Sequence, residues 1–252
     1  MSAEVARMDE TNEVDHVDQL DPESPDVPDS ADAAAPIRVL LVDDQELFRA
    51  GVAVVVGADP GINVVGEASD GREAVALVDA LEPDVVLMDI RMPELDGVEA
   101  TRQIFAPERA ARRPRPVRVI VLTTFNLDDR AATAIRYGAS GFLLKDATPD
   151  VLREAIRTVH LGNAVLSPAD LGSLLEGDFR RRSATPAAYS QLTEREREVF
   201  AGVARGLSNA EIASTVFVSE STVKTHVGAI LRTLDLRDRV QIVVFAYEHA
   251  LV

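Results

Sequence analysis

Five residues with chemically useful side chains each follow or end a short apolar run in this chain of 252 residues: Asp43, Asp44, Asp89, Thr123 and Lys145. Carboxylates held together repel one another unless a cation joins them, and Mg²⁺ is a hard divalent ion that prefers such oxygen ligands. A lysine beside these carboxylates becomes useful when a more negative group, such as a phosphoryl group, arrives. The set therefore predicts a site where one aspartate is phosphorylated, Lys145 and Mg²⁺ neutralise the phosphoryl oxygens, and Thr123 donates a hydrogen bond.

Each member of this set is a weak signal when it is taken alone. An Asp-Asp pair after a strand is often only a turn or a helix cap. Lys145, however, is one of two lysines in a chain with 24 arginines. That bias indicates a position where a compact ammonium is needed rather than a forked guanidinium.

The elements that must position these residues alternate between two apolar patterns. Five runs rich in Val, Ile and Leu have the length of buried strands: 37–42, 63–68, 85–88, 117–122 and 141–144. Five segments with helical apolar spacing follow them: 46–57, 71–81, 97–106, 129–137 and 149–161. This alternation predicts an α/β domain, a doubly wound parallel sheet with helices on both faces. The carboxyl ends of its strands would bring the five residues into one crevice.

The net charge of −16 is concentrated near the start of the sequence. Residues 1–36 carry eleven acids and one base, whereas the other 216 residues carry 31 acids and 25 bases, so the overall acidity does not exclude nucleic acid as a partner. Residues 1–36 also contain four prolines and no aromatic residue, so we expect a disordered acidic tail. It could be a solvating tail, the product of a wrongly assigned start codon or a regulatory segment.

The remaining composition narrows the class of protein. There is no cysteine, which excludes disulfides, thiolate metal sites and cysteine nucleophiles. No apolar run approaches the ~18 residues of a membrane helix, and the N-terminus lacks the pattern of a secretory signal. We therefore expect a soluble cytoplasmic protein with no membrane partner.

The last third of the chain contains only helical patterns. We expect a linker with a short helix near 168–176 over 162–189, and a separate all-α domain over 190–252. Capping-box patterns begin at Thr193 and Ser208, and Ser219 suits a third helix start. A helix, a tight turn and a second helix whose outer face carries small and basic residues form the geometry of a helix-turn-helix DNA-binding motif. An ordinary helical hairpin with a solvated face remains the alternative, because eight acids and seven bases over 190–252 do not favour DNA.

Residues 37–161 resemble a response-regulator receiver domain. The matching segments are 39–44, 87–93, 96–97, 122–124 and 138–145. The resemblance implies a flavodoxin-like fold in which Asp89 accepts the phosphoryl group. It also implies that Asp44, Asp89 and the carbonyl of Arg91 coordinate Mg²⁺, while Asp43 acts through a bound water.

The same resemblance implies a switch pair, Thr123 and Phe142. Thr123 moves toward the phosphoryl oxygen and the ring of Phe142 turns inward, which changes a face of the domain. The segment 105–118 is longer and more basic than the usual connection at that place. It lies where the strands begin, so we expect it to leave phosphorylation intact.

Three segments of the last domain closely resemble the LuxR-type helix-turn-helix: 192–199, 206–213 and 218–227. Together with the receiver domain, they indicate the NarL/FixJ family. The resemblance, with the outer face of the third helix, implies a DNA-binding set: Ser221, Thr222, Lys224, Thr225, His226, Gly228 and Arg232. In that set Lys224 and Thr225 face base edges, whereas Gly228 offers no side chain. The last helix, expected over 237–250, packs partly on its own domain, and the remainder could form a two-fold dimer contact.

The function expected from these features is a phosphorylation-switched transcription factor. A sensor histidine kinase donates the phosphoryl group, and the protein then binds double-stranded DNA as a homodimer. The alternative is a phosphorylation-independent DNA-binding regulator with a receiver-like dimerisation domain. An aspartyl-phosphate phosphohydrolase would need a second acid near Asp89, but Ile90, Arg91 and Met92 follow it. We therefore expect no enzyme beyond the domain's own phosphorylation and dephosphorylation.

Overall fold

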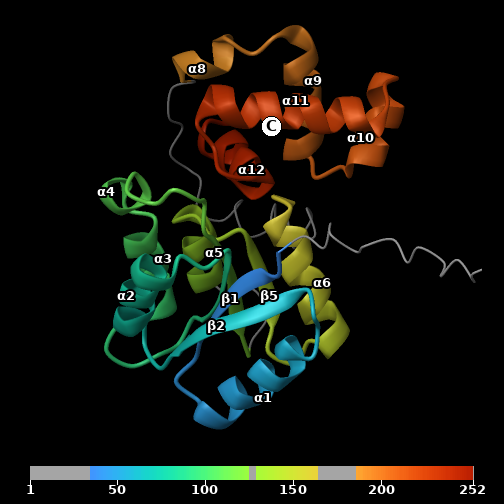
Figure 1. Cartoon of the computed structure of the whole chain (residues 1–252). Helices are drawn as coiled ribbons and strands as arrows, with labels where there is room; N and C mark the ends of the chain where they lie inside the picture. Colours follow the sequence, from blue (N-terminus) through green and yellow to red (C-terminus); the bar gives the residue numbers. More distant parts are fainter. Residues whose placement is uncertain (1–34, 125–128, 164–185, 252) are drawn as a thin grey trace, which may run out of the picture. The chain divides into compact units, whose positions relative to one another are not determined.

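A computed structural model describes residues 35–124, 129–163 and 186–251 (Figure 1). The short helix expected near 168–176 and residues 1–34 of the acidic tail expected over 1–36 lie outside the described residues. Residues Ala35–Val252 form one compact unit. No helix among the described residues is both long and apolar enough to cross a membrane.

The first part of the chain forms a five-stranded parallel sheet with the strand order β2-β1-β3-β4-β5, so the predicted fold class is confirmed. The strands are β1 (Ile37–Val42), β2 (Ile62–Ala68), β3 (Val85–Asp89), β4 (Arg118–Thr123) and β5 (Gly141–Leu144). All residues of β3 are buried. Strands in the middle of a parallel sheet are covered on both faces, which explains the continuous apolar runs in the sequence.

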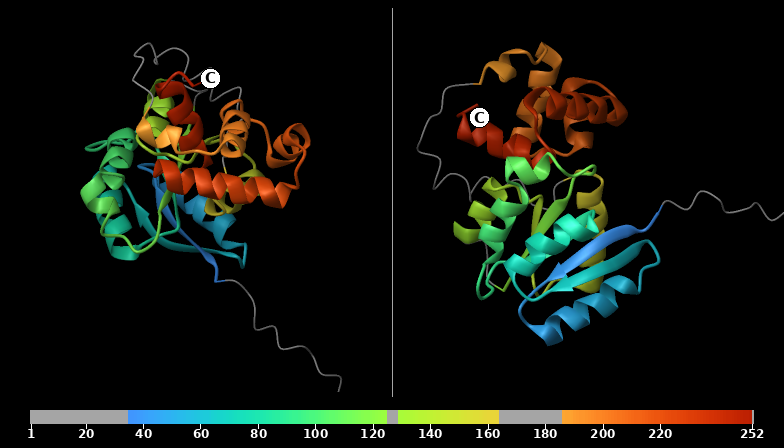
Figure 2. Two further views of the ribbon diagram at one scale, coloured as in Figure 1. Left: turned by 90° about the horizontal axis from the view of Figure 1, so that it is seen from above. Right: turned by 60° about the vertical axis from the view of Figure 1, so that its left-hand side comes forward.

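Helices cover both faces of this sheet (Figures 1 and 2). They are α1 (Glu46–Gly57), α2 (Gly71–Leu81), α3 (Gly97–Ile104), α5 (Asp129–Arg136) and α6 (Pro149–His160). Leu41 of β1 belongs to the core that α1 and α6 cover, whereas its neighbour Leu40 belongs to the core that α2, α3 and α5 cover. This alternation follows from the two-residue period of a strand.

The connection between α3 and β4 departs from the expected pattern. Helix α3 ends at Ile104, two residues before its predicted end, and a four-residue helix α4 (Pro107–Ala110) follows. Pro107 explains the break, because proline disfavours helical backbone at the residue before it and fits the first turn of a new helix. The basic segment 105–118 therefore contains a helical turn of its own.

The C-terminal part is helical throughout its described residues. Its helices are α8 (Ala187–Ser190), α9 (Glu194–Ala204), α10 (Asn209–Val216), α11 (Glu220–Leu234) and α12 (Arg239–Glu248). Both predicted capping boxes are present: Thr193 pairs with Glu196, and Ser208 pairs with Glu211. Phe217 turns the chain between α10 and α11 in a left-handed backbone conformation. Its side chain is 93% exposed.

Helix α12 is shorter than predicted and is buried on more than one side. Asp238 caps its start, because the carboxylate accepts a hydrogen bond from the backbone N–H of Gln241. One side of α12 packs on α9 and another side packs on α5. At the second contact Ser140 Oγ lies 2.6 Å from Asp238 Oδ2, and Gln241 Nε2 donates to the carbonyl of Ile135 at 3.2 Å. The last helix therefore contacts the domain that holds the sheet.

Candidate phosphorylation site and DNA-binding surface

The carboxyl edge of the sheet brings four of the predicted residues together. Asp43 follows β1, Asp89 ends β3, Thr123 ends β4 and Lys145 follows β5. These strands are adjacent in the order β1-β3-β4-β5, so their ends meet at one edge. A short backbone hydrogen bond of 2.7 Å from Lys145 to Thr123 fixes the last two ends relative to each other.

Lys145 lies between two carboxylates at this edge. Its Nζ is 2.6 Å from Asp43 Oδ2 and 2.9 Å from Asp89 Oδ2, and all three side chains are no more than 7% exposed. Asp44 completes the group: one carboxylate oxygen from each of the three aspartates lies within 4.8 Å of the others. We call Asp43, Asp44, Asp89 and Lys145 the acidic cluster. Three carboxylates this close are typical of a Mg²⁺ site in a receiver domain.

Burial dominates the electrostatics of the acidic cluster. Desolvation raises the pKa of Asp89, and the neighbouring charge of Asp43 raises it further, while Lys145 acts in the opposite direction. Desolvation alone would lower the pKa of Lys145, but its hydrogen bonds and charge interactions with both aspartates reverse the effect, so that pKa is raised. The ammonium is thereby held in its charged form between two carboxylates.

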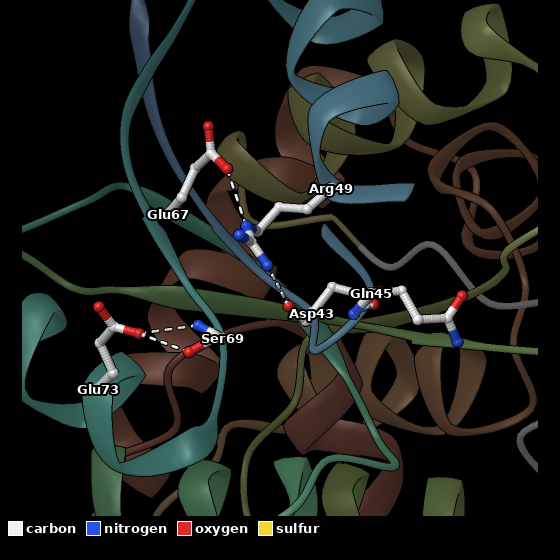
Figure 3. Close-up of polar contacts among 6 residues, drawn as sticks. All are labelled: Asp43, Gln45, Arg49, Glu67, Ser69 and Glu73. Atoms are coloured by element: carbon white, nitrogen blue, oxygen red, sulfur yellow. Dashed lines mark hydrogen bonds and ion pairs between the residues drawn. The ribbon is translucent and has the colours of Figure 1, made fainter. Parts of the chain in front are cut away.

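Residues outside the predicted set hold Asp43 in place (Figure 3). The backbone N–H of Gln45 donates to Asp43 Oδ1 at 2.9 Å, and Arg49 donates to the carbonyl of Asp43 at 2.7 Å. Arg49 also forms an ion pair with Glu67 on β2 at 2.8 Å. The ring of Phe48 lies 4.8 Å from Lys145 Nζ. Phe48 and Arg49 lie in the first turn of α1, which packs on β1 and β2, so their positions depend on how this helix packs against the sheet.

Thr123 and one further predicted residue, Phe142, lie on adjacent strands and share a face of the sheet. Thr123 is buried, and Phe142 is half-buried against the core that α2, α3 and α5 cover. In the β4–β5 register Phe142 pairs with Val121, two residues before Thr123, so both side chains face the same side. Arg91 is exposed, and its backbone N–H donates to Asp89 Oδ1 at 3.3 Å.

The backbone around Asp89 also requires a small neighbour. Gly97 begins α3, and a Cβ atom at this position would overlap the carbonyl oxygen of Asp89. The backbone N–H of Gly97 donates to the carbonyl of Ile90 at 3.0 Å. Glycine therefore allows the loop after β3 to close tightly beside the acidic cluster.

The predicted DNA-binding residues all lie on α11. Lys224, Thr225, Ser221 and Arg232 are exposed, whereas Thr222, His226 and Gly228 are half-buried. Apolar residues on the other side of the helix, Val223, Ile230 and Leu234, are buried in the core. We call the seven predicted residues the outer face of α11.

Two bases of the outer face of α11 lie close to helix α9. Hydrogen bonds from Thr193 lower the pKa of Glu196, and the charges of His226 and Arg232 contribute to that shift. Thr225 Oγ1 donates to the carbonyl of Ser221 at 3.0 Å. Gly228 leaves open space on the surface, because the nearest atom to a Cβ there would be Arg232 Nη1 at 3.6 Å. Lys224 and Arg232 are the exposed cations of this face.

Comparisons with known proteins agree with both regions. The family model described as response regulator receiver domain matches residues 39–157, and the model described as bacterial regulatory proteins, luxR family, matches residues 190–246. Transcriptional regulatory protein LiaR of Bacillus subtilis is 41% identical over 216 residues, which cover 86% of this chain and 99% of LiaR. Response regulator protein VraR of Staphylococcus aureus is 37% identical over 217 residues, which cover 86% of this chain and 99% of VraR.

Among solved structures, the response regulator ChrA of a heme-sensing two-component system is 33% identical to this chain. The match covers 87% of this chain and 100% of ChrA, with a TM-score of 0.45. The matched families and relatives are regulators of transcription rather than enzymes. The chain therefore belongs to the NarL family of two-component response regulators, in which a receiver domain is joined to a LuxR-type helix-turn-helix domain that regulates transcription.

Proposed function

We propose that Asp89 is the phospho-acceptor of this response regulator and that a sensor histidine kinase is the donor. The observation that supports this assignment is the position of Lys145, whose ammonium bridges Asp43 and Asp89 in a buried setting. A cation there can exchange a carboxylate for a phosphoryl oxygen without leaving the site. In this proposal residues 37–161 are the receiver domain, 162–189 the linker and 190–252 the DNA-binding domain.

The transfer is a substitution at phosphorus. A carboxylate oxygen of Asp89 forms the new P–O bond while the P–N bond to the kinase histidine breaks, and the imidazole leaves with that electron pair. Lys145 turns from the Asp89 carboxylate toward a phosphoryl oxygen. Thr123 donates its hydroxyl hydrogen to another phosphoryl oxygen, and the adjacent Phe142 ring moves inward as Thr123 shifts.

The donor set of the acidic cluster fits Mg²⁺, because hard carboxylate oxygens from Asp44 and Asp89 are available together with backbone carbonyls such as that of Arg91. When bound, Mg²⁺ neutralises negative charge that develops on the phosphoryl oxygens. In this proposal Asp43 would help to hold the ion through a water. Exposed Asp44 leaves the site open to solvent, from which the ion can enter.

The contact between α12 and the receiver domain offers a route from phosphorylation to DNA binding. Phe142 lies on β5, and Ser140 directly before that strand holds Asp238 at the start of α12. A change in β5 and α5 would alter this contact. Release of α12 would then expose the side that packs on α5, and that side becomes available to a second copy of the chain.

The phosphorylated protein binds double-stranded DNA as a homodimer in this proposal, with the outer face of α11 in the major groove. Lys224 and Thr225 contact base edges, whereas Thr222, His226 and Arg232 contact phosphates. Few basic side chains contact the DNA, so each protomer binds it weakly and two protomers are needed. We place the protein in the cytoplasm, where a kinase domain and DNA are both accessible.

Intact-mass analysis after incubation with a small phosphodonor and Mg²⁺ tests the assignment. The wild type should gain one phosphoryl group, Asp89→Asn should gain none, and the wild type alone should shift toward dimer. The neighbouring variant Asp44→Asn keeps the acceptor and should be modified more slowly. An equal adduct on Asp89→Asn would refute Asp89 as the acceptor.

A further inference from the structure

A second charged site lies at the amino edge of the sheet, on the side opposite the acidic cluster. A cavity of about 280 Å³ there is bordered by the end of the basic segment 105–118 and by Arg237, which precedes α12. Three of its lining residues are arginines, Arg113, Arg115 and Arg237, and none of its lining residues is acidic. Neither phosphorylation at Asp89 nor the outer face of α11 accounts for this concentration of positive charge.

Packing, rather than a polar partner, positions Arg237. Its guanidinium lies 3.7 Å from the centre of the Phe105 ring. It also rests against the backbone of Gly138, where a Cβ atom would overlap both Arg237 and Phe105. Within the described ranges, no hydrogen bond or ion pair of Arg237 is formed. Its N–H donors are therefore held at the cavity wall and are not used by another residue.

Arg113 is the buried member of the set. Its side chain is 6% exposed, and it donates to Asp79 Oδ1 at 2.9 Å and to the carbonyl of Ile104 at 2.7 Å. Its Nε atom is buried and has no hydrogen-bond partner among the described residues. Asp79 also pairs with Arg109, so one carboxylate serves two guanidinium groups. Positive charge consequently remains uncompensated beside the cavity.

Asp238, the residue after Arg237, interacts with its charge but does not line the cavity. Asp238 is buried, with its oxygens already engaged by Ser140 and by the backbone N–H of Gln241. Desolvation lowers the pKa of Arg237; the charge of Asp238 opposes this shift, and repulsion from the charge of Arg113 adds to it. An anion between the guanidinium groups would relieve that repulsion.

We infer that this cavity binds the phosphate group of a small phosphorylated molecule. Guanidinium groups form paired, charge-assisted hydrogen bonds with phosphate oxygens, and three arginines line this cavity. The volume lies near the lower end of the ~300–1,000 Å³ range of small-molecule sites. Phe105 and the prolines Pro114 and Pro116 provide an apolar wall for the organic part of the ligand.

The two sides of the cavity belong to different domains. Arg113 and Arg115 come from the receiver domain, and Arg237 comes from the helical domain. A bound phosphate group would link them, so it stabilises the contact between α12 and α5. The ligand would therefore oppose the release of α12 on phosphorylation, a consequence that rests on the proposed function, whereas binding itself does not.

Calorimetric titration of the full chain tests the inference, with inorganic phosphate and then adenosine monophosphate as probes in Mg²⁺-free buffer. The wild type should show one saturable site. Arg115→Gln and Arg237→Gln should each weaken binding by about tenfold or more, since each removes a charged hydrogen bond. Arg112→Gln is the matched control, because Arg112 is exposed on the same segment but does not line the cavity. Its dissociation constant should stay within about twofold of the wild type.

Several outcomes would overturn the inference. They are the absence of saturable binding in the wild type, equal weakening in Arg112→Gln, and binding that is lost in Lys145→Gln but kept in Arg237→Gln. The last result would place the anion at the acidic cluster. Arg115 is exposed, so its variant should fold, and thermal unfolding provides a second readout. Phosphate should raise the Tm of the wild type and of Arg112→Gln, but not that of Arg237→Gln.

Discussion

The acidic cluster and the outer face of α11 are built in opposite ways. Asp43, Asp89 and Lys145 come from the ends of three strands, and their side chains are almost completely buried. Lys224 and Thr225 come from one helix and are exposed. The first region exists only when distant segments meet, whereas the second requires one helix to begin at the correct residue.

This difference matches the chemistry that we propose for each region. Opposite charges interact more strongly in a dry site, and their loss is more costly there. DNA phosphates and base edges must instead be approached from solvent, so the residues that contact them stay exposed. The two regions can be altered separately, and the contact of Ser140 with Asp238 joins the domain that holds the first to the domain that holds the second.

The largest expected effect comes from removing the cation of the buried region. Lys145→Ala should lower the free energy of unfolding by about 3 kcal/mol at neutral pH without Mg²⁺, because Asp43 and Asp89 then remain buried without a counter-charge. Urea denaturation measures this change, and added Mg²⁺ should recover part of it. The double variant Lys145→Ala/Asp89→Asn should also recover part of it. A single variant as stable as the wild type would contradict the role of Lys145 in compensating these charges.

The exposed region should respond in function rather than in stability. Lys224→Ala should weaken binding to an operator selected with the wild type by about tenfold, equivalent to the ~1–3 kcal/mol of a direct base contact. Fluorescence anisotropy measures the affinity, and phosphorylation of Asp89 should be unchanged. Arg205→Ala, an exposed arginine at the end of α9, is the control and should bind nearly as tightly as the wild type. Equal losses in both variants would indicate general charge attraction.

The contribution of a local hydrogen bond to the stability of the helical domain can be tested at Thr193, which caps the start of α9. Thr193→Ala removes the capping box of α9 and should lower the free energy of unfolding by about 1 kcal/mol. Thr148 occupies the corresponding position before α6, but its side chain makes no capping hydrogen bond. Thr148→Ala should therefore change stability far less in the same denaturation assay. A larger loss of stability in Thr148→Ala than in Thr193→Ala would show that the cap hydrogen bond does not stabilise α9.

The smallest effect concerns the contact between the domains. Burial raises the pKa of Asp238, so the folded chain binds this proton at a higher pH than the unfolded chain. The stabilising contribution of Asp238 is complete below its unfolded pKa and is lost as pH rises through the folded pKa. Asp238→Asn should therefore gain stability relative to the wild type as pH rises through this range. Denaturation curves at a series of pH values measure the difference in unfolding free energy between the variant and the wild type. A difference that does not change with pH would contradict the raised pKa of Asp238.

Much of the fold could be predicted because its signals are local. The capping boxes at Thr193 and Ser208 mark helix starts through hydrogen bonds between residues three positions apart. The apolar runs mark strands because both faces of the parallel sheet are covered. The apolar spacing predicts a helix to residue 106, but α3 ends at Ile104, because Pro107 disfavours helical backbone at the residue before it.

The sequence by itself determined which segments become strands and helices, which acids follow the strands, and which face of α11 is polar, since each depends on spacing along one segment. Only the tertiary structure decided that Lys145 bridges two aspartates, that Arg49 holds the backbone of Asp43, and that Arg237 stacks on Phe105. These contacts join residues separated by long stretches of chain, except for Arg49. They depend on the crossing of whole elements, and no periodicity within a segment encodes that geometry.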